Sequence, residues 1–310
     1  MDESSRPAGC GTGPRPFGVR GAVGVGVNGP ACVRSVPGRW QNHRVRLRID
    51  LSYDGTDFRG WATQPGLRTV QGELTGALAT ILRTPEVAVV CAGRTDSGVH
   101  ARGQVVHTDV PDTTEPADLA RRLNGVLPAD VRVRRVVEAA PGFDARFGAL
   151  WRRYAYRVAD RVDLLDPLTR AHVLTWARPL DLDLMNQAST LLLGRHDFAA
   201  FCKQREGATT IRTLLDLEWG RDDAGVVVGT VRADAFCHSM VRALVGCLLA
   251  VGDGRRPPQW VGEVLQAGRR EGAAAVVHAH GLTLEEVAYP ADDELAARAT
   301  QTMAKRVADE

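Results

Sequence analysis

Short stretches of alternating hydrophobic and polar residues are separated along the chain by stretches in which hydrophobic residues recur every three or four positions. Residues 45–51 alternate with a period of two, which predicts a half-buried β-strand. After Thr69, a candidate helix N-cap, hydrophobic residues follow at helical spacing from Val70 to Ile81 and predict a helix. The other elements predicted in this half are strands at residues 87–91, 104–109 and 131–137 and a helix that begins at Pro116. The order of elements is β-α-β-β-α-β.

The second half of the chain has the same order of predicted elements. Strands are expected at residues 153–159, 211–219, 226–233 and 283–289, and helices at residues 181–193, 237–251 and 257–267. The predicted fold is therefore α+β, with two pseudo-duplicated βαββαβ halves of the ferredoxin-like or RRM-like type and mainly antiparallel sheets around a central catalytic cleft. Such sheets leave one face free of helices, and RNA-binding proteins commonly use that face.

Composition and periodicity together predict the limits of these halves. Residues 1–44 form a Gly/Pro-rich extension that we expect to be disordered. The N-terminal half spans 45–148, the C-terminal half 149–290, and residues 291–310 form a polar tail. Within the extension, residues 24–29 have the spelling of a dinucleotide-binding motif. No strand precedes them and a proline follows where a helix would begin, so we do not interpret them as a nucleotide site.

The cysteines and the hydrophobic segments narrow the class of protein. No hydrophobic run reaches the roughly 18 residues that a membrane-spanning helix needs, and the N-terminus lacks the hydrophobic core of a signal peptide, so we expect a cytoplasmic protein. Six cysteines occur without a C-x-x-C pair or the spacing of zinc ligands. We therefore expect reduced thiols, with neither disulfides nor a metal site.

Arginine dominates the basic residues of the chain. All but two of the 39 basic residues are arginine, although the net charge is only +2. A guanidinium group donates two parallel hydrogen bonds to phosphate, which suits a nucleic-acid partner. A GC-rich genome would produce the same bias, so the composition permits an RNA or DNA partner without indicating one.

The sequence C-A-G-R-T-D-S-G-V-H-A at residues 91–101 is the most informative segment. It places a carboxylate, Asp96, in a turn flanked by Gly93 and Gly98, which allow the backbone to bend sharply and to approach a ligand. Two predicted strands hold this loop, and rigidly held loops often carry catalytic residues. The alternative is an Asx turn, in which the carboxylate of Asp96 would accept a hydrogen bond from its own backbone.

Several motifs together resemble the tRNA pseudouridine synthase A family. They follow one another in the family's order, at residues 53–61, 69–74, 91–101, 143–147, 153–156, 194–198, 240–242 and 281–282. The resemblance implies an isomerase that converts uridine to pseudouridine at positions 38, 39 and 40 of the tRNA anticodon stem-loop. It also implies a homodimer, no cofactor and no metal.

The resemblance assigns roles to three catalytic residues. Asp96 corresponds to the family's essential aspartate, and Arg242 to the arginine that pairs with it and favours the ionised carboxylate. Tyr154 corresponds to the tyrosine that lies against the target base. A carboxylate can promote cleavage of the glycosidic bond by attacking carbon 1′, by taking the 2′ proton, or by stabilising an oxocarbenium-like centre. The sequence leaves these three routes open.

Further residues are implied in binding the substrate. Leu282, with Tyr154, is expected to bind the target nucleotide, and Arg94 to occupy the space that the flipped base leaves or to hold the RNA backbone. The RNA-binding segment implied by the family consists of Phe143, Asp144, Ala145, Arg146 and Phe147. Its phenylalanines can equally belong to the protein core.

Some neighbouring residues have simpler interpretations. We expect His100 and His107 to satisfy local hydrogen bonds, and Tyr156 to pack in the core. The sequence departs from the family at Ser97, beside Asp96, where the family usually has alanine. It also departs at Cys237 and Ser239, which lie in a helix start that in the family is more often hydrophobic or contains histidine. Ser97 is therefore a candidate for altering the hydrogen bonding of Asp96.

Two other classes of function compete with the isomerase. One is a noncatalytic RNA-binding protein or tRNA chaperone on the same scaffold, for which Asp96 would be dispensable. The other is a nucleoside hydrolase that uses Asp96 on ribose and releases free uracil. The sequence has none of the calcium-binding aspartate clusters of that class.

Overall fold

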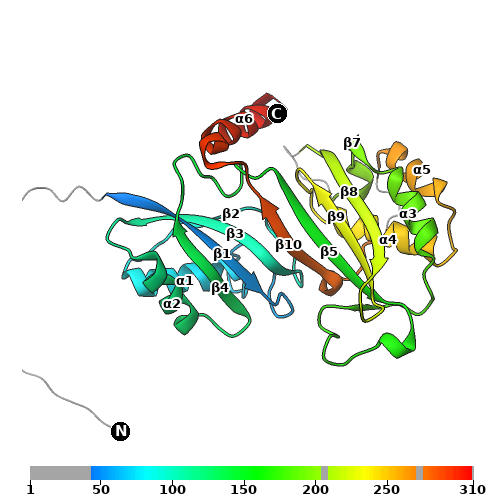
Figure 1. Ribbon diagram of the computed structural model, residues 1–310, viewed down its shortest axis with the longest axis horizontal. Coiled ribbons are helices and arrows are strands. Elements are labelled where there is room, and N and C mark those ends of the chain that lie inside the picture. Colours follow the sequence, from blue (N-terminus) through cyan, green and yellow to red (C-terminus); the bar gives the residue numbers. More distant parts are fainter. Residues whose placement is uncertain (1–42, 204–208, 270–274, 309–310) are drawn as a thin grey trace, which may run out of the picture. The chain divides into compact units, whose positions relative to one another are not determined.

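A single sheet organises the protein. The computed structural model describes residues 43–203, 209–269 and 275–308, which lie in one compact unit, Asn42–Glu310 (Figure 1). In these residues ten strands form one sheet with the order β4-β1-β3-β10-β5-β9-β8-β7, while β2 pairs with β3 and β6 with β5. All pairings are antiparallel except β10 with β3 and β5 with β6. The protein is therefore α+β with a mostly antiparallel sheet.

The N-terminal part of the sheet follows the predicted pattern closely. Its elements are β1 (Arg44–Tyr53), α1 (Val70–Leu82), β2 (Val90–Cys91), β3 (His100–Pro111), α2 (Pro116–Val126) and β4 (Val131–Glu138). On β1, Leu47, Ile49 and Leu51 are fully buried, whereas the alternating residues remain partly exposed. Thr69 caps α1 as predicted, because its hydroxyl accepts a hydrogen bond from the Gly72 N–H at 3.2 Å.

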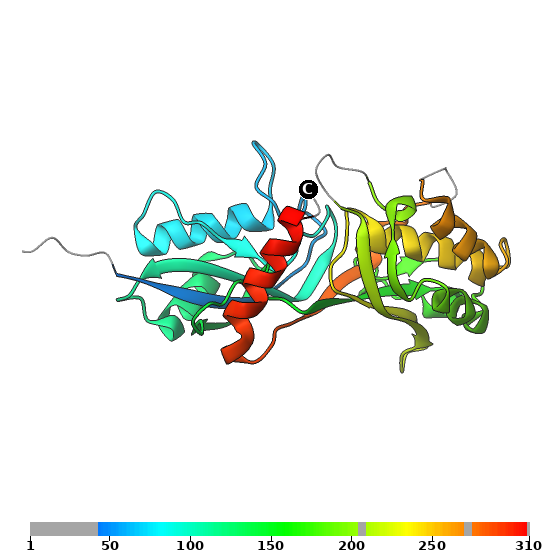
Figure 2. The ribbon, with the colours of Figure 1, turned by 90° about the horizontal axis from the view of Figure 1, so that it is seen from above.

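The C-terminal part contains most of the remaining elements. They are β5 (Trp151–Ala159), β6 (Leu174–Thr175), α3 (Leu182–Thr190), β7 (Gly194–Asp197), β8 (Ile211–Arg221), β9 (Val227–Ala233), α4 (Met240–Gly252), α5 (Gln259–Ala267), β10 (Leu282–Ala288) and α6 (Leu295–Ala308). Every residue of α4 except Arg242 is buried, as expected of a helix that is hydrophobic on all sides. Figure 2 shows α1 in one part of the molecule and α3, α4 and α5 in the other, with β10 passing between them.

The largest correction to the predicted fold concerns the number of sheets. Two sheets were expected, but β10 joins the two parts into one. Its residues Thr283 and Leu284 pair in parallel with His100 and Ala101 of β3, and the same strand pairs antiparallel with β5. A contact of so few residue pairs between segments far apart in the sequence leaves no periodic signal, and the sequence therefore could not predict it.

Several predicted element bounds also change. The strand predicted at residues 87–91 is reduced to β2, because Val87 and Val89 are buried without pairing in the sheet. The next strand begins earlier than predicted, at His100, which shortens the loop that carries Asp96 to residues 92–99. The helix predicted from residue 237 begins at Met240.

The predictions for the two ends of the chain can be compared with the structure only in part. The predicted polar tail contains α6, whose Leu295 and Ala299 are buried. Residues 1–42, which include most of the predicted disordered extension and the motif at residues 24–29, lie outside the described residues. Among the helices of the described part of the chain, none has the length and apolar character that crossing a membrane requires.

Candidate active site

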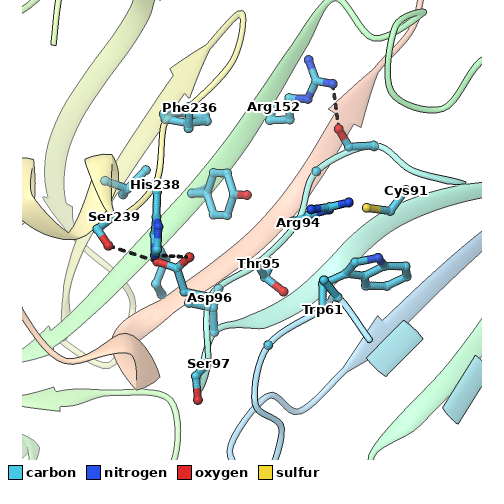
Figure 3. A pocket seen from close by; sticks show the side chains of 18 of the residues that line it. Trp61, Cys91, Arg94, Thr95, Asp96, Ser97, Arg152, Phe236, His238 and Ser239 are labelled. Atoms are coloured by element: carbon cyan, nitrogen blue, oxygen red, sulfur yellow. Dashed lines mark hydrogen bonds and ion pairs between the residues drawn. The ribbon is translucent and has the colours of Figure 1, made fainter. Parts of the chain in front are cut away.

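One cavity collects the predicted catalytic residues from both parts of the sheet (Figure 3). Its volume is about 640 Å³. The walls come from the loop after β1, the loop 92–99, strand β5 and the segment 235–242 that leads into α4. Of the residues singled out in the sequence, the cavity is lined by Arg94, Asp96, Arg146, Tyr154, Arg242 and Leu282.

Backbone hydrogen bonds hold the loop of Asp96 against the loop that follows β1. The Trp61 N–H donates to the Thr95 carbonyl at 3.0 Å, and the Thr95 hydroxyl is 2.8 Å from the phenol of Tyr53. Gly60, with φ of +89°, is needed here, because an added Cβ would lie 2.9 Å from the Thr95 carbonyl oxygen. These contacts explain why the motif at residues 53–61 accompanies the Asp96 loop.

The carboxylate of Asp96 is directed at the N-terminal end of α4 and not at its own backbone. Its Oδ2 lies 3.6 Å from Nη1 of Arg242 and accepts a hydrogen bond from the Ser239 hydroxyl at 3.4 Å. Its Oδ1 lies 3.4 Å from Nε2 of His238. Arg242 is itself anchored by a 2.8 Å hydrogen bond from its Nε to the Val277 carbonyl. The structure therefore brings together Asp96 and Arg242 as predicted, and the Asx turn is not observed.

Tyr154 lies in an apolar part of the cavity. Its ring packs edge-on against Phe236, with 5.1 Å between the ring centroids and an interplanar angle of 87°. Burial raises the pKa of the Tyr154 phenol well above its usual value, and the negative charge of Asp96 raises it further. The phenol is therefore neutral over the whole physiological range. Leu282, which is buried, lines the same cavity.

Three exposed arginines line the cavity: Arg59, Arg94 and Arg146, which we call the cavity arginines. None of them has a carboxylate within ion-pair distance among the described residues. The guanidinium of Arg146 lies over the ring of Phe147, 5.3 Å from its centroid. The cavity arginines therefore leave their hydrogen-bond donors available for an anionic ligand.

A fourth arginine has a structural role. Arg152 is buried, and its guanidinium donates to the carbonyl oxygens of Ala92, Arg146 and Asp234, each at 2.7 Å. Burial lowers the pKa of Arg152 from its usual value. Because two of these carbonyls belong to cavity residues, Ala92 and Arg146, and the third belongs to the residue before the segment 235–242, Arg152 ties these three segments together.

The segment 143–147 divides into core and surface. Phe143 and Ala145 are buried, and the ring of Phe143 lies 4.9 Å from that of Tyr289. The carboxylate of Asp144 accepts hydrogen bonds from the backbone N–H groups of Arg146 and Phe147 at 2.8 and 2.7 Å. Of this segment only Arg146 lines the cavity. Phe143 and Ala145 are therefore part of the core, which is the alternative that the sequence left open for the phenylalanines.

The histidines near the loop have the structural roles that we expected. Nδ1 of His100 accepts from the Gly55 N–H at 3.0 Å, and Nδ1 of His107 accepts from the Ala145 N–H at 2.9 Å. Ser97 does not contact Asp96. Its hydroxyl donates to the Phe58 carbonyl at 3.1 Å, and Figure 3 shows its side chain directed away from the carboxylate.

The cysteine prediction is wrong for one pair. The structure joins Cys202 and Cys237 by a disulfide, with 5.8 Å between their Cα atoms. The two cysteines are 35 residues apart in the sequence, and only the fold brings them together. Cys91 and Cys247 are free and buried, as expected. Among the described residues no group of histidine, cysteine and carboxylate side chains could hold a metal ion.

No role was predicted from the sequence for Arg59, Phe236, His238 or Ser239, which are among the residues that line the cavity. Arg59 lies in the motif at residues 53–61, which contributed to the family resemblance but did not indicate a function for Arg59. His238 and Ser239 precede the Met-Val-Arg motif by one or two residues, and their contacts with Asp96 depend on the backbone conformation before α4.

Comparison with known proteins agrees with this geometry. A family model described as tRNA pseudouridine synthase matches residues 51–148 and 188–290. A tRNA pseudouridine synthase A of Frankia casuarinae is 60% identical over 263 residues, which cover 85% of this chain and 96% of the relative. The protein of that name from Streptomyces griseus is 62% identical over 262 residues, covering 83% and 92%. For that of Cutibacterium acnes the identity is 54% over 265 residues, covering 84% and 95%.

Proposed function

Because the chain belongs to the tRNA pseudouridine synthase family, and is thus an isomerase that acts on uridine in tRNA, we propose that it modifies positions 38, 39 and 40 of the anticodon stem-loop through the carboxylate of Asp96. The reaction detaches uracil from its ribose, turns the base, and rejoins it through carbon 5. The convergence of Asp96, Arg242 and Tyr154 on one cavity carries this proposal.

Each of these residues has a role that its surroundings support. Asp96 acts at the ribose of the target nucleotide, by attack on carbon 1′, by removal of the 2′ proton or by stabilisation of an oxocarbenium-like centre. Arg242 orients the carboxylate and offsets its charge. The neutral ring of Tyr154 stacks on the detached uracil, and its hydroxyl is available for proton transfer at carbon 5.

The cavity arginines bind the RNA backbone around the flipped nucleotide. A uridine inside the anticodon stem must leave the base stack, which costs a few kcal/mol. Arg94 lies in the same loop as Asp96 and is exposed at the cavity, so it is placed to occupy the vacated space or to hold the displaced strand. Arg59 and Arg146 contact neighbouring phosphates. The reaction needs no cofactor in this scheme.

We also propose that the two parts of the sheet are a pseudo-duplication, with halves at residues 45–148 and 149–290. The strand order is β4-β1-β3-β2 in the first half and β10-β5-β9-β8 in the second. When the short strands β6 and β7 are set aside, both orders place the fourth, first, third and second strands side by side, which supports this proposal.

We further propose that the protein works as a homodimer in the cytoplasm, where tRNA is found. The loop after β5 supports a subunit interface, because 85% of Val162 and 88% of Leu168 are exposed. Light scattering on the purified protein measures its mass. A mass near twice 33.5 kDa is expected, and that of a single chain at micromolar concentration would contradict the dimer.

The proposed reaction is tested with an unmodified tRNA transcript whose uridines carry tritium at carbon 5. Rejoining the base through carbon 5 releases that tritium, so wild type should release it in proportion to the uridines at positions 38, 39 and 40. Transcripts with one of these uridines at a time identify the positions used. Tight binding without tritium release would favour a noncatalytic RNA-binding protein, and free uracil would indicate a hydrolase.

A further inference from the structure

The segment that leads into α4 surrounds the carboxylate of Asp96 more completely than one arginine would. His238, Ser239 and Arg242 all reach it, and they face both of its oxygens. Oδ2 is shared by Ser239 and Arg242, whereas His238 is the side chain that faces Oδ1 within the described part of the chain. Figure 3 shows His238 and Ser239 on the same side of the carboxylate.

An uncommon backbone conformation makes this arrangement possible. Ser239 has φ of +65° and ψ of 6°, the left-handed region, and Arg83 is the only other non-glycine residue with a positive φ among those described. Such a conformation costs on the order of 1 kcal/mol for a residue with a side chain, and it tends to occur at functional sites. Here it bends the chain so that two consecutive side chains, His238 and Ser239, approach the same carboxylate.

The imidazole of His238 has a defined hydrogen-bonding state. Its Nε2 faces a carboxylate oxygen, which only accepts hydrogen bonds, so Nε2 carries a proton. Its Nδ1 is buried without a partner among the described residues. A buried N–H without an acceptor is rarer than an acceptor without a donor, so the contacts favour Nε2 as the nitrogen that donates. The backbone of His238 is held by the Lys203 N–H, which donates to its carbonyl at 3.0 Å.

We propose that His238 is a positioning residue that donates its Nε2–H to Oδ1 of Asp96 and fixes the rotation of the carboxylate. This inference rests on the proposed function of Asp96. A carboxylate turns about its Cβ–Cγ bond, and the contacts of 3.4 and 3.6 Å to Oδ2 are long enough to restrain that rotation only loosely. With both oxygens held, the carboxylate presents one orientation to the ribose, which matters because catalysis depends on near-attack geometry. The 3.4 Å distance is that of the unliganded site, where such contacts are often longer than in the complex.

Two substitutions separate the donor from the bulk of the ring. His238→Phe keeps a ring and removes the donor, and His238→Gln places an amide N–H near the position of Nε2. His196→Phe is the matched control, since His196 is also half-buried and makes a hydrogen bond through Nε2, to the Leu193 carbonyl, away from the cavity. We expect His238→Phe to lower kcat by on the order of 100-fold, with little change in KM or in tRNA affinity. His238→Gln should recover most of that loss, and the control should stay near wild type.

A second measurement needs no turnover. The imidazole ¹⁵N resonances of His238 are identified as those lost in His238→Gln, and they report which nitrogen carries the proton. In wild type we expect a proton on Nε2, and the Nε2 resonance should move when Asp96→Asn weakens the acceptor. The resonances of His196 should not respond.

Three results would contradict the positioning role of His238. An unchanged kcat in His238→Phe, a loss that His238→Gln does not recover, or ¹⁵N resonances that ignore Asp96→Asn would overturn it. If wild type released no tritium, the proposed function would fail, whereas the ¹⁵N response would still decide whether His238 holds Asp96.

Discussion

Arginines in two regions of the molecule have opposite surroundings. The cavity arginines, Arg59, Arg94 and Arg146, have no carboxylate within ion-pair distance among the described residues. Four arginines on the strands, which we call the paired strand arginines, each contact a carboxylate at 2.7–2.9 Å: Arg46 with Asp109, Arg102 and Arg157 with Glu285, and Arg153 with Glu286.

This difference shows why the arginine content of the sequence could not locate an RNA surface. An arginine whose donors already contact a carboxylate must lose that contact before it binds phosphate, whereas a free guanidinium binds without that loss. The count of basic residues is therefore less informative than the count of acidic residues beside them. The comparison supports the proposal that tRNA binds at the cavity, where unpaired arginines lie beside Asp96, and gives the paired strand arginines a structural role.

The largest expected effect is on the rate of tritium release, and it compares the loss of a carboxylate in the cavity with the loss of one on the strands. Asp96→Asn removes the carboxylate that we propose acts on the ribose, and we expect the rate of tritium release to fall by on the order of 10⁴-fold or more. Binding of tRNA, measured by filter retention, should persist. Asp109→Asn is the matched control, because it removes the partner of Arg46 without touching the cavity. Equal losses of activity in the two variants would show that the effect of Asp96 is structural.

The second expected effect concerns the arginines directly. Arg146→Ala should weaken tRNA binding by about tenfold and reduce the slope of log K against log salt by about 0.7–0.9, which corresponds to one lost phosphate contact. Arg153→Ala should change neither quantity measurably, since Arg153 already contacts Glu286 at 2.9 Å. A change in slope for Arg153 as large as that for Arg146 would remove the distinction between the two groups of arginines.

The sequence predicted the elements better than their assembly. Helix α1 begins and ends close to the predicted positions, because the Thr69 cap and the spacing of hydrophobic residues are local signals. The alternation of hydrophobic residues at Val87 and Val89 predicted a strand, but these side chains are buried in the core without pairing in the sheet. The pairing of β10 with β3 involves only two residue pairs from distant segments, and no local pattern reports it.

The candidate site divides in the same way. Asp96 was found from its own glycine-flanked loop, and Arg242 and Tyr154 from the resemblance. The contacts of His238 and Ser239 with Asp96 were not predicted, because they depend on the left-handed backbone at Ser239. A serine before a helix ordinarily predicts an N-cap, but here its hydroxyl caps no backbone N–H and contacts the carboxylate instead.

A third effect tests how the segment that carries Arg146 is held. Burial, together with the nearby charge of Arg46, lowers the pKa of His107 below its usual value, and Nδ1 of His107 accepts from the Ala145 N–H. In the window between the unfolded pKa of about 6.5 and the lower folded pKa, the unfolded chain binds more protons. The free energy of unfolding should therefore fall as the pH is lowered through this window, by at most about 1.4 kcal/mol per pH unit for this residue.

Urea unfolding at about pH 7.5 and pH 5.5 measures this dependence. His107→Gln keeps an acceptor for the Ala145 N–H and removes the titration, so its stability should depend less on pH than that of wild type. Part of the dependence should remain, because burial also lowers the pKa of His172 and His280. An identical pH dependence in wild type and His107→Gln would show that the segment is held by other contacts.

The smallest effect is expected for a substitution that leaves a paired strand arginine without its carboxylate. Glu286→Gln removes the charge that Arg153 contacts at a largely solvent-exposed position, where an ion pair contributes at most about 1 kcal/mol to stability. Stability should therefore change little, while non-specific RNA binding at low salt should strengthen by about twofold, because Arg153 gains a free guanidinium. Arg153→Ala combined with Glu286→Gln should return binding to the wild-type value. If Glu286→Gln left binding unchanged even at low salt, the lack of a carboxylate partner would not be what lets an arginine bind RNA. The proposed role of the cavity arginines would then rest on their position beside Asp96 alone.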